Sequence, residues 1–219
     1  MSRNGAGGVN VRKRLTQKER KEITRKLLLE SAVEIFAKFG FHGASVDKIA
    51  DHAGFSKGAV YGHFQSKEEL FLALLENRMN MHAENINNLI EQEYTVSHTI
   101  EKINAYFNSV KEENRTMSML NMEFLLYAMR KESVRDKWSG MISQSVGRIS
   151  ESIEVLMKKE NHKLSLPSQD IAWIILSLEN GMSIFHYIGE NSVPSDLYGK
   201  ALKTLLLASK RENEDHLLT

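Results

Sequence analysis

The sequence predicts an all-α protein, and three observations support this fold class. Apolar residues recur with the period of a helix from Glu22 onward, in the series Ile23, Leu27, Leu28, Ala32, Ile35, Phe36 and Phe39. Only two of the 219 residues are proline, so few positions interrupt a long helix. No stretch alternates steadily between apolar and polar residues, and neither of the two Asn-Gly pairs, 4–5 and 180–181, joins two such stretches as a hairpin turn would.

The composition is that of an ordinary soluble globular protein, with 42% hydrophobic and 26% charged residues. The chain has no cysteine, which excludes disulfides, thiolate metal sites and cysteine nucleophiles. No apolar segment follows the N-terminal arginines, so no signal peptide is expected. The longest nearly unbroken apolar run, 171–178, is too short to span a bilayer. We therefore expect a cytoplasmic protein without a membrane partner.

Four helices are predicted in the N-terminal third. A flexible basic arm over 1–17, with the cluster Arg12-Lys13-Arg14, precedes a helix that Gly40 ends. Capping serines then begin the next three helices. Ser45 opens a helix over 46–53 that Gly54 terminates, and Ser56 opens one over 57–64. The sequence Ser66-Lys67-Glu68-Glu69 is a capping box for a long fourth helix that runs to about Ala83.

The rest of the chain predicts further helices with less distinct ends. They fall near 99–111, 117–131 and 135–158. A proline followed by a serine opens each of the last two, over 169–188 and 197–210. Residues 211–219 are expected to be a flexible tail.

Charge divides the chain into a basic and an acidic part. Residues 1–67 hold 13 Lys and Arg against 6 Asp and Glu, a balance of +7. Residues 68–219 hold 16 against 22, a balance of −6. A basic end on an acidic body suggests that this end meets a polyanion. A merely solvated basic tail is the alternative.

The short helices over 46–53 and 57–64, joined by a turn that contains Gly54, form a candidate helix-turn-helix. The second of them would enter the major groove of DNA, with its N-terminal residues toward the base edges. Ile49, Ala50 and Val60 are apolar where the two helices must touch. Gly58 and Gly62 are poor helix formers, but they would let the helix backbone approach DNA closely.

Residues 39–50, 53–64 and 66–70 together resemble the DNA-binding domain of tetracycline-repressor (TetR-like) transcription regulators. The similarity covers roughly Thr24 to Leu75 and rests on many spaced positions that agree at once. It implies an N-terminal helix-turn-helix domain, 18–67, joined to a C-terminal helical domain for ligand binding and dimerisation, 68–210.

The resemblance also implies DNA contacts at matching positions. Ser45 and Ser56 would bond phosphates, although both also cap helices whether or not DNA is present. The base-reading end of the recognition helix would comprise Lys57, Gly58 and Ala59, and Ala59 could touch a thymine methyl group. Three further residues would contact the DNA backbone: Tyr61, His63 and Lys67. Arg12, Lys13 or Arg14 would add phosphate or minor-groove contacts, or would only aid solubility.

The C-terminal half is expected to provide a ligand cavity and a homodimer interface. The helix over 169–188 is apolar on most sides and that over 197–210 carries an apolar stripe, so these two would pack against their copies in a partner. Closure of the monomer core is the alternative. The Met-rich segment 117–129 suits an adaptable apolar pocket. The candidate ligand residues are Tyr106, Phe107, Met119, Met122, Glu123, Phe124, Tyr127, Trp138, Trp173 and His186.

The sequence thus favours a regulator, in outline a repressor released from a palindromic operator by a small apolar ligand. No H-E-x-x-H, G-x-S-x-G, Walker-A or dinucleotide-binding pattern occurs, so enzymatic function lacks support. No metal site and no cofactor are expected. The other alternative is a helical protein-interaction adaptor without specific DNA binding, which would leave the basic end unexplained.

Overall fold

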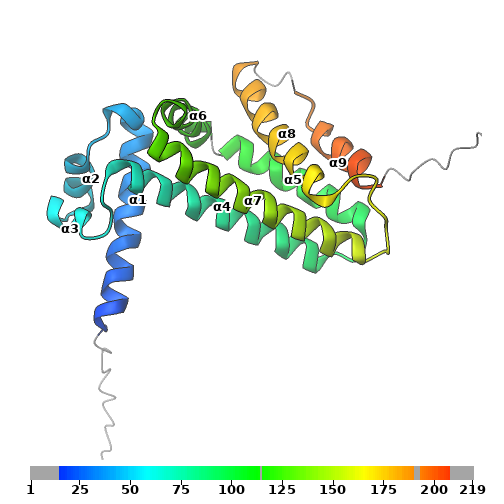
Figure 1. Ribbon diagram of the computed structural model, residues 1–219, viewed down its shortest axis with the longest axis horizontal. Coiled ribbons are helices and arrows are strands. Elements are labelled where there is room, and N and C mark those ends of the chain that lie inside the picture. Colours follow the sequence, from blue (N-terminus) through cyan, green and yellow to red (C-terminus); the bar gives the residue numbers. More distant parts are fainter. Residues whose placement is uncertain (1–14, 114, 190–192, 208–219) are drawn as a thin grey trace, which may run out of the picture.

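The structure is a computed structural model that describes residues 15–113, 115–189 and 193–207. All regular structure in these residues is helical, which confirms the predicted fold class (Figure 1). The helices in chain order are α1 (Gln17–Gly43), α2 (Val46–Ala53), α3 (Lys57–Tyr61), α4 (Lys67–Gln92), α5 (Val96–Glu113), α6 (Arg115–Arg130), α7 (Glu132–Lys158), α8 (Ser168–Ile188) and α9 (Leu197–Leu207). The basic cluster 12–14 and the tail 211–219 lie outside the described residues.

Capping residues and glycines shape the ends of the N-terminal helices. Thr16 and Glu19 form a capping box, so α1 starts at Gln17, ahead of the first apolar position that the sequence pattern marks. Gly40 interrupts α1 with a positive φ of 70°, and Gly54 ends α2 with a φ of 71°. Helix α3 is shorter than predicted, because it ends at Tyr61 and not at Phe64.

A first apolar core joins α1, α2 and α3 to the body of the molecule. It combines buried residues of α1, α2 and α3 with Leu70–Leu75 of α4 and with Leu120, Phe124 and Ala128 of α6. The rings of Phe36, Phe41, Phe71 and Phe124 meet here with centroids 4.5 to 5.9 Å apart. The first three helices therefore rest on α4 and α6 and share one core with them.

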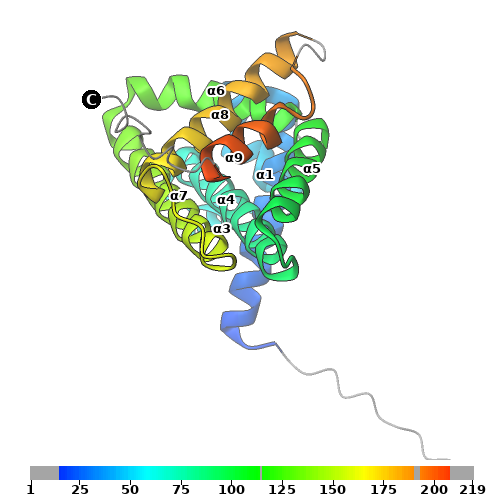
Figure 2. The ribbon, with the colours of Figure 1, turned by 90° about the vertical axis from the view of Figure 1, so that its right-hand side faces the viewer.

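A second core occupies the other end of the molecule, where α4, α5, α7, α8 and α9 surround it (Figure 2). Helix α4 reaches Gln92, beyond the predicted end near Ala83, and Ile86, Leu89 and Ile90 on this extension pack into the second core. Helix α8 is long and apolar enough to cross a membrane, but it packs along α7 in the helical body.

Helix α9 places part of its apolar stripe inside its own chain. Its stripe residues Leu202 and Leu206 are only 2% and 3% exposed, because they are buried in the second core of the same chain. These two residues of α9 thus belong to the monomer core. Helix α8 differs, since Trp173, Ile174, Phe185 and Ile188 remain at least 40% exposed.

Candidate nucleic-acid interface and ligand cavity

Buried apolar contacts fix α2 and α3 relative to each other at the end of the molecule opposite α9 (Figure 1). Ile49, Ala50, Val60 and Phe64 are at most 2% exposed, as the sequence pattern predicts. Because these four side chains face inward, the opposite side of α3 faces solvent. The pair of helices has the form of a helix-turn-helix, whose second helix presents its N-terminal end outward.

The solvent-facing side of α3 carries the residues expected to read DNA. Lys57 and Gly58 are exposed, Ala59 is half-buried, and Tyr61 is 48% exposed. No atom outside the helix's own neighbourhood lies closer than 3.8 Å to the place where a Cβ of Gly58 would be, so its backbone is open to an approaching partner. The surface at this end of α3 is thus accessible, and Gly58 and Ala59 contribute little side-chain bulk to it.

Ser45 and Ser56 both act as N-caps in the structure. The hydroxyl of Ser45 accepts the backbone N–H of Lys48 at 3.3 Å, and that of Ser56 accepts the N–H of Ala59 at 3.2 Å. A capping hydroxyl uses its oxygen as acceptor, and its own hydrogen stays available to donate. Each serine can therefore cap its helix and still donate to a phosphate oxygen.

The surroundings of α3 shift the pKa values of Lys57 and His63. The Lys57 ammonium donates to Asp47 at 2.9 Å, and this hydrogen bond and the attraction of the carboxylate raise its pKa. His63 has a lowered pKa, first because of burial and then because of the nearby cations Lys21 and Arg25. The Nδ1 of His63 is buried and has no hydrogen-bond partner. His63 is therefore neutral near pH 7 in the absence of DNA.

Lys67, for which the family resemblance implies a phosphate contact, bonds backbone oxygens at the end of α1. Its ammonium donates to the backbone oxygens of Phe41 at 2.7 Å and Ala44 at 3.0 Å, and it lies 4.6 Å from the centre of the Phe41 ring. Burial lowers its pKa. Lys67 thus donates hydrogen bonds to carbonyls at the end of α1, which no intrahelical N–H can reach.

Glu123 lies at the end of α1 and not in a ligand pocket. Its carboxylate accepts the N–H of Phe41 at 3.0 Å and that of His42 at 3.1 Å. These amides follow the break at Gly40, where a Cβ would come within 3.0 Å of the Glu123 carboxylate. Glu123 therefore holds the short turn after Gly40, and Gly40 leaves room for it.

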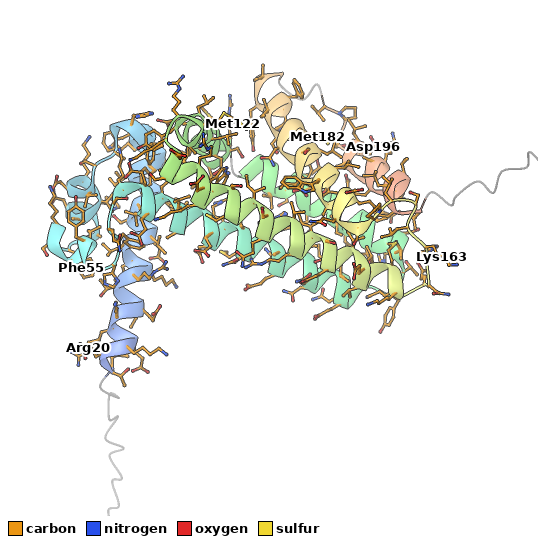
Figure 3. All side chains as sticks on the ribbon, in the orientation of Figure 1. Arg20, Phe55, Met122, Lys163, Met182 and Asp196 are labelled. Atoms are coloured by element: carbon orange, nitrogen blue, oxygen red, sulfur yellow. The ribbon has the colours of Figure 1, made fainter. Side chains whose placement is uncertain are left out.

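A cavity of about 550 Å³ lies between α4, α5, α6, α7, α8 and α9. Of the predicted ligand residues, Phe107, Met119 and Met122 line it. Figure 3 marks Met122 on α6 and Met182 on α8 in the body of the molecule, away from Phe55 at the helix-turn-helix. The volume lies within the range of about 300–1,000 Å³ that is typical of small-molecule sites.

The other predicted ligand residues lie outside this cavity lining. Phe124, Tyr127 and Trp138 belong to the first core or pack against it, so they contribute to the joint between α1, α4 and α6. The hydroxyl of Tyr106 accepts a hydrogen bond from Asn85 at 3.0 Å, and Trp173 is 44% exposed on α8. His186 is half-buried on α8 and is not among the lining residues.

Sequence reasoning missed two arginines of the cavity wall, Arg78 on α4 and Arg148 on α7. The spacing of Arg78 could have revealed it. It lies four positions after the buried Leu74 and four before His82, in line with the inward face of α4. A cation in such a line is either buried with a partner or faces a cavity.

The fold and the site together define a helical DNA-binding regulator, with a helix-turn-helix at one end and a ligand-sized cavity in the body. The sequence model of the bacterial regulatory proteins of the tetR family matches residues 28–74. Over these residues the chain matches this family of transcription regulators.

Two curated relatives match different extents of the chain. The activator FasR of Mycolicibacterium smegmatis is 45% identical over 75 residues, which cover 34% of this chain and 32% of FasR. The regulator YfiR of Bacillus subtilis is 23% identical over 199 residues, which cover 89% of this chain and 97% of YfiR. The chain thus spans about a third of the length of one relative and nearly all of the other.

Solved structures share the fold over most of the chain. FadR from Bacillus subtilis in complex with stearoyl-CoA has a TM-score of 0.65 at 18% identity and covers 83% of this chain and 97% of its own. A transcriptional regulator from Saccharomonospora viridis in complex with choline has a TM-score of 0.64 at 16% identity and covers 86% and 97%. One fold therefore holds ligands of opposite charge.

Proposed function

We propose that the protein is a cytoplasmic, homodimeric repressor that binds a palindromic operator and is released from it by a small, largely apolar ligand. The observation that carries this proposal is the accessible N-terminal end of α3, held by α2 on the basic end of the chain. We assign it no catalytic activity. In this proposal residues 18–67 bind DNA, and residues 68–210 bind the ligand and form the dimer.

The DNA contacts form two groups, those to base edges and those to the sugar-phosphate backbone. Lys57, Gly58 and Ala59 approach the base edges, since they occupy the exposed start of α3. Ser45, Ser56, Tyr61 and His63 contact the sugar-phosphate backbone and set the register of the helix. Lys67 takes part indirectly, because its bonds to the carbonyls of Phe41 and Ala44 hold α4 against α1.

Helix α8 is the dimer surface. Trp173, Ser177, Gly181, Phe185 and Ile188 recur at intervals of three or four positions and so share one face. The three large side chains are 44% to 78% exposed, and nothing lies within 4 Å of a Cβ built on Gly181. Two copies of α8 can therefore cross closely at Ser177 and Gly181, with the large side chains packed on either side.

A dimer of this kind must place its two α3 helices about 34–36 Å apart to read both halves of a palindrome. A ligand that binds better to a body with another spacing shifts the protein away from DNA, by no more than its difference in affinity for the two states. Helix α6 links the two sites, because Met119 and Met122 line the cavity and Glu123 bonds the end of α1.

The test is selection of fragmented genomic DNA by the purified full-length protein, followed by sequencing of the retained fragments. We expect one inverted repeat to be enriched. The variant Lys57→Gln, Tyr61→Ala should lose this enrichment, while Lys137→Gln, which removes an exposed cation of α7, should keep it. The affinity for the selected site should fall steeply as salt rises, because each neutralised phosphate releases counterions.

Weak retention of DNA without sequence preference, equal in wild type and the double variant, would contradict the proposal. The adaptor function would then account better for the chain. Repression and activation are separated by placing the selected site upstream of a reporter gene, since the relatives include both an activator and repressors.

A further inference from the structure

The charged residues of the cavity wall are unequally divided between cations and acids. Arg78 of α4 and Arg148 of α7 both line the cavity, whereas Glu179 of α8 is the one acid among the described lining residues. We propose that the cavity binds an amphiphile with a long alkyl chain and an anionic head group, and that Arg78 and Arg148 hold the head group. This inference rests on the proposed ligand site and names the class of its ligand.

The acid of the wall is already engaged by neighbouring side chains. The buried hydroxyl of Tyr198 donates to Oε1 of Glu179, and Nε2 of His82 lies 3.9 Å from Oε2. Burial next to Glu179 raises the pKa of Tyr198, so this hydroxyl remains protonated and remains a donor. Both oxygens of Glu179 are thus directed toward Tyr198 and His82, while its single negative charge stands against the two arginine charges of the wall.

The two arginines lie near the same turn of α4. Arg148 donates to the amide oxygen of Asn80, two positions after Arg78, and this neutral acceptor leaves the charge of the guanidinium in place. Burial lowers the pKa of Arg78, which means that its cation has lost solvation. Because both side chains line the cavity, an anionic group within it could accept N–H bonds from these guanidiniums.

Further polar groups line the same end of the cavity. The hydroxyls of Ser118 and Tyr187 are hydrogen-bonded at 3.2 Å, and the Tyr187 oxygen lies near enough to Arg78 to act on its pKa. The side-chain oxygen of Asn121, also in the lining, is buried without a hydrogen-bond partner. Exchange of the amide oxygen and nitrogen would direct an N–H donor to this place. A carboxylate or phosphate here would accept the Asn121 N–H and lie among the hydroxyls.

The opposite end of the cavity is apolar. Ile86 and Ile90 continue the lining along α4, and they face Ile153 and Leu156 of α7 and Leu202 of α9. Ile90 is 12 positions after Arg78, which corresponds to about 18 Å along a helix axis. A slot of this length, cationic at one end and aliphatic at the other, fits an extended alkyl chain better than a compact ring system.

The experiment compares ligands that share one alkyl chain and differ in the head group: laurate, lauroyl-CoA, dodecanol and dodecyltrimethylammonium. Binding to the full-length protein is measured by calorimetric titration below the micellar concentration of each. We expect laurate, lauroyl-CoA or both to bind at least about tenfold more tightly than dodecanol, since a charge-assisted hydrogen bond contributes more than a neutral one. The two anionic arms distinguish a free carboxylate from an acyl thioester as the source of the head group.

Variants of Arg78 test whether this residue binds the head group. Arg78→Gln should weaken the anionic ligand by about 10- to 100-fold and leave dodecanol unchanged. Arg78→Lys should recover part of the affinity because it keeps the charge. Arg135→Gln, on the exposed part of α7 outside the cavity, is the matched control. Melting temperatures of all variants establish that each is folded.

Equal binding of dodecanol and laurate, tightest binding of dodecyltrimethylammonium, or full affinity in a folded Arg78→Gln variant would each overturn this inference. Operator binding measured on the same preparations keeps it separate from the proposed function. If laurate binds through Arg78 and leaves DNA affinity unchanged, the ligand class stands and the release mechanism fails. If DNA is bound specifically and no anionic amphiphile binds, only the ligand class fails.

Discussion

Three side chains close the joint between the start of α4 and the end of α6. The Glu68 carboxylate accepts hydrogen bonds from the Tyr127 hydroxyl at 2.6 Å and from the Lys131 ammonium at 2.7 Å. Burial of Glu68 raises its pKa, but the bonds from Lys131 and Tyr127 outweigh this effect and lower the pKa to about 2. The same contact raises the pKa of Lys131. This joint therefore contributes to stability only while Glu68 is ionised.

Glu68→Gln should lower the free energy of unfolding at pH 7 by about 1–3 kcal/mol, the range for hydrogen bonds to a charged group. In the wild type the unfolded chain takes up a proton near pH 4.5, whereas folded Glu68 stays ionised down to about pH 2. Stability is therefore lost as pH falls through this window. Urea unfolding of both proteins between pH 7 and 3 checks this, and a difference that is constant over that range would contradict it.

Lys67 and Lys57 should respond differently to loss of charge. Lys67→Met removes two bonds to carbonyls at the end of α1, so we expect a loss of about 1–3 kcal/mol of stability without DNA present. Lys57→Gln removes an exposed ion pair, which contributes about 0–1 kcal/mol, and its main effect should be on DNA affinity. Thermal unfolding and DNA titration of both variants separate the effect on stability from the effect on DNA affinity. A stable Lys67→Met with weakened DNA binding would restore the phosphate role.

The roles of single residues were harder to predict than the helices that carry them. The resemblance to the family predicted an accessible start of α3, and the structure has it. Glu123 and Tyr127 were expected in a pocket, but their partners at 41, 42 and 68 lie more than 50 positions away in sequence. Periodicity shows which side of a helix is apolar and does not show which distant backbone group a buried carboxylate will meet.

At the scale of elements, α3 combines poor helix formers with an exposed surface. Gly58→Ala should raise stability by up to about 1 kcal/mol, since the added Cβ would lie in ordinary contact with the Ser56 hydroxyl, 3.8 Å away. The same methyl group should weaken operator binding by about tenfold or more, because it stands where the backbone approaches the bases. For stability, Gly62→Ala provides the contrast, because its Cβ would come within 3.3 Å of the Ala59 carbonyl and should destabilise the fold. A Gly58→Ala variant with unchanged operator affinity would place this part of α3 away from DNA.

Helix α8 yields a prediction about assembly. Phe185→Glu should convert the dimer to a monomer, because an acid on each copy would be buried opposite its symmetry mate. Met81→Glu alters a comparably exposed apolar residue on α4, 55% against 64% exposed, and should leave the dimer intact. Light scattering after size exclusion measures the mass of each variant. A dimeric Phe185→Glu would move the interface away from α8.

The starts of helices α2, α3 and α4 could be predicted from their capping serines. The serines at 45, 56 and 66 each accept the N–H of the third residue beyond them, and the helices begin where these residues predict. The extension of α4 past Ala83 was missed because its sequence is rich in Asn and Glu. Only Ile86, Leu89 and Ile90 mark its inward side, and the core that buries them comes from α5, α7, α8 and α9. Tertiary packing here outweighs a weak local signal.

At the scale of the whole molecule, one helix connects the cavity with the DNA-binding end. Helix α6 carries Met119 and Met122 in the cavity wall, and on the next position Glu123 bonds the amides of Phe41 and His42. The aromatic contact of Phe41 with Phe124, 5.0 Å between ring centres, reinforces this link. A ligand that moves α6 must therefore either move the end of α1 or break these bonds. Both outcomes change how α2 and α3 are presented to DNA.

Glu123→Ala should uncouple the two sites, since it removes the bonds to Phe41 and His42 without touching the lining residues or α3. Operator affinity and ligand affinity should each stay close to wild type, while the ligand-induced loss of operator affinity shrinks. Couplings of this kind amount to about 1–3 kcal/mol, or 5- to 150-fold in affinity. The measurement is operator titration with and without saturating ligand, at a temperature where calorimetry shows the variant folded. Leu126→Ala, on the exposed side of α6, is the control and should respond like wild type. An undiminished response in Glu123→Ala would mean that the signal travels instead through α4, which also lines the cavity and supports α1.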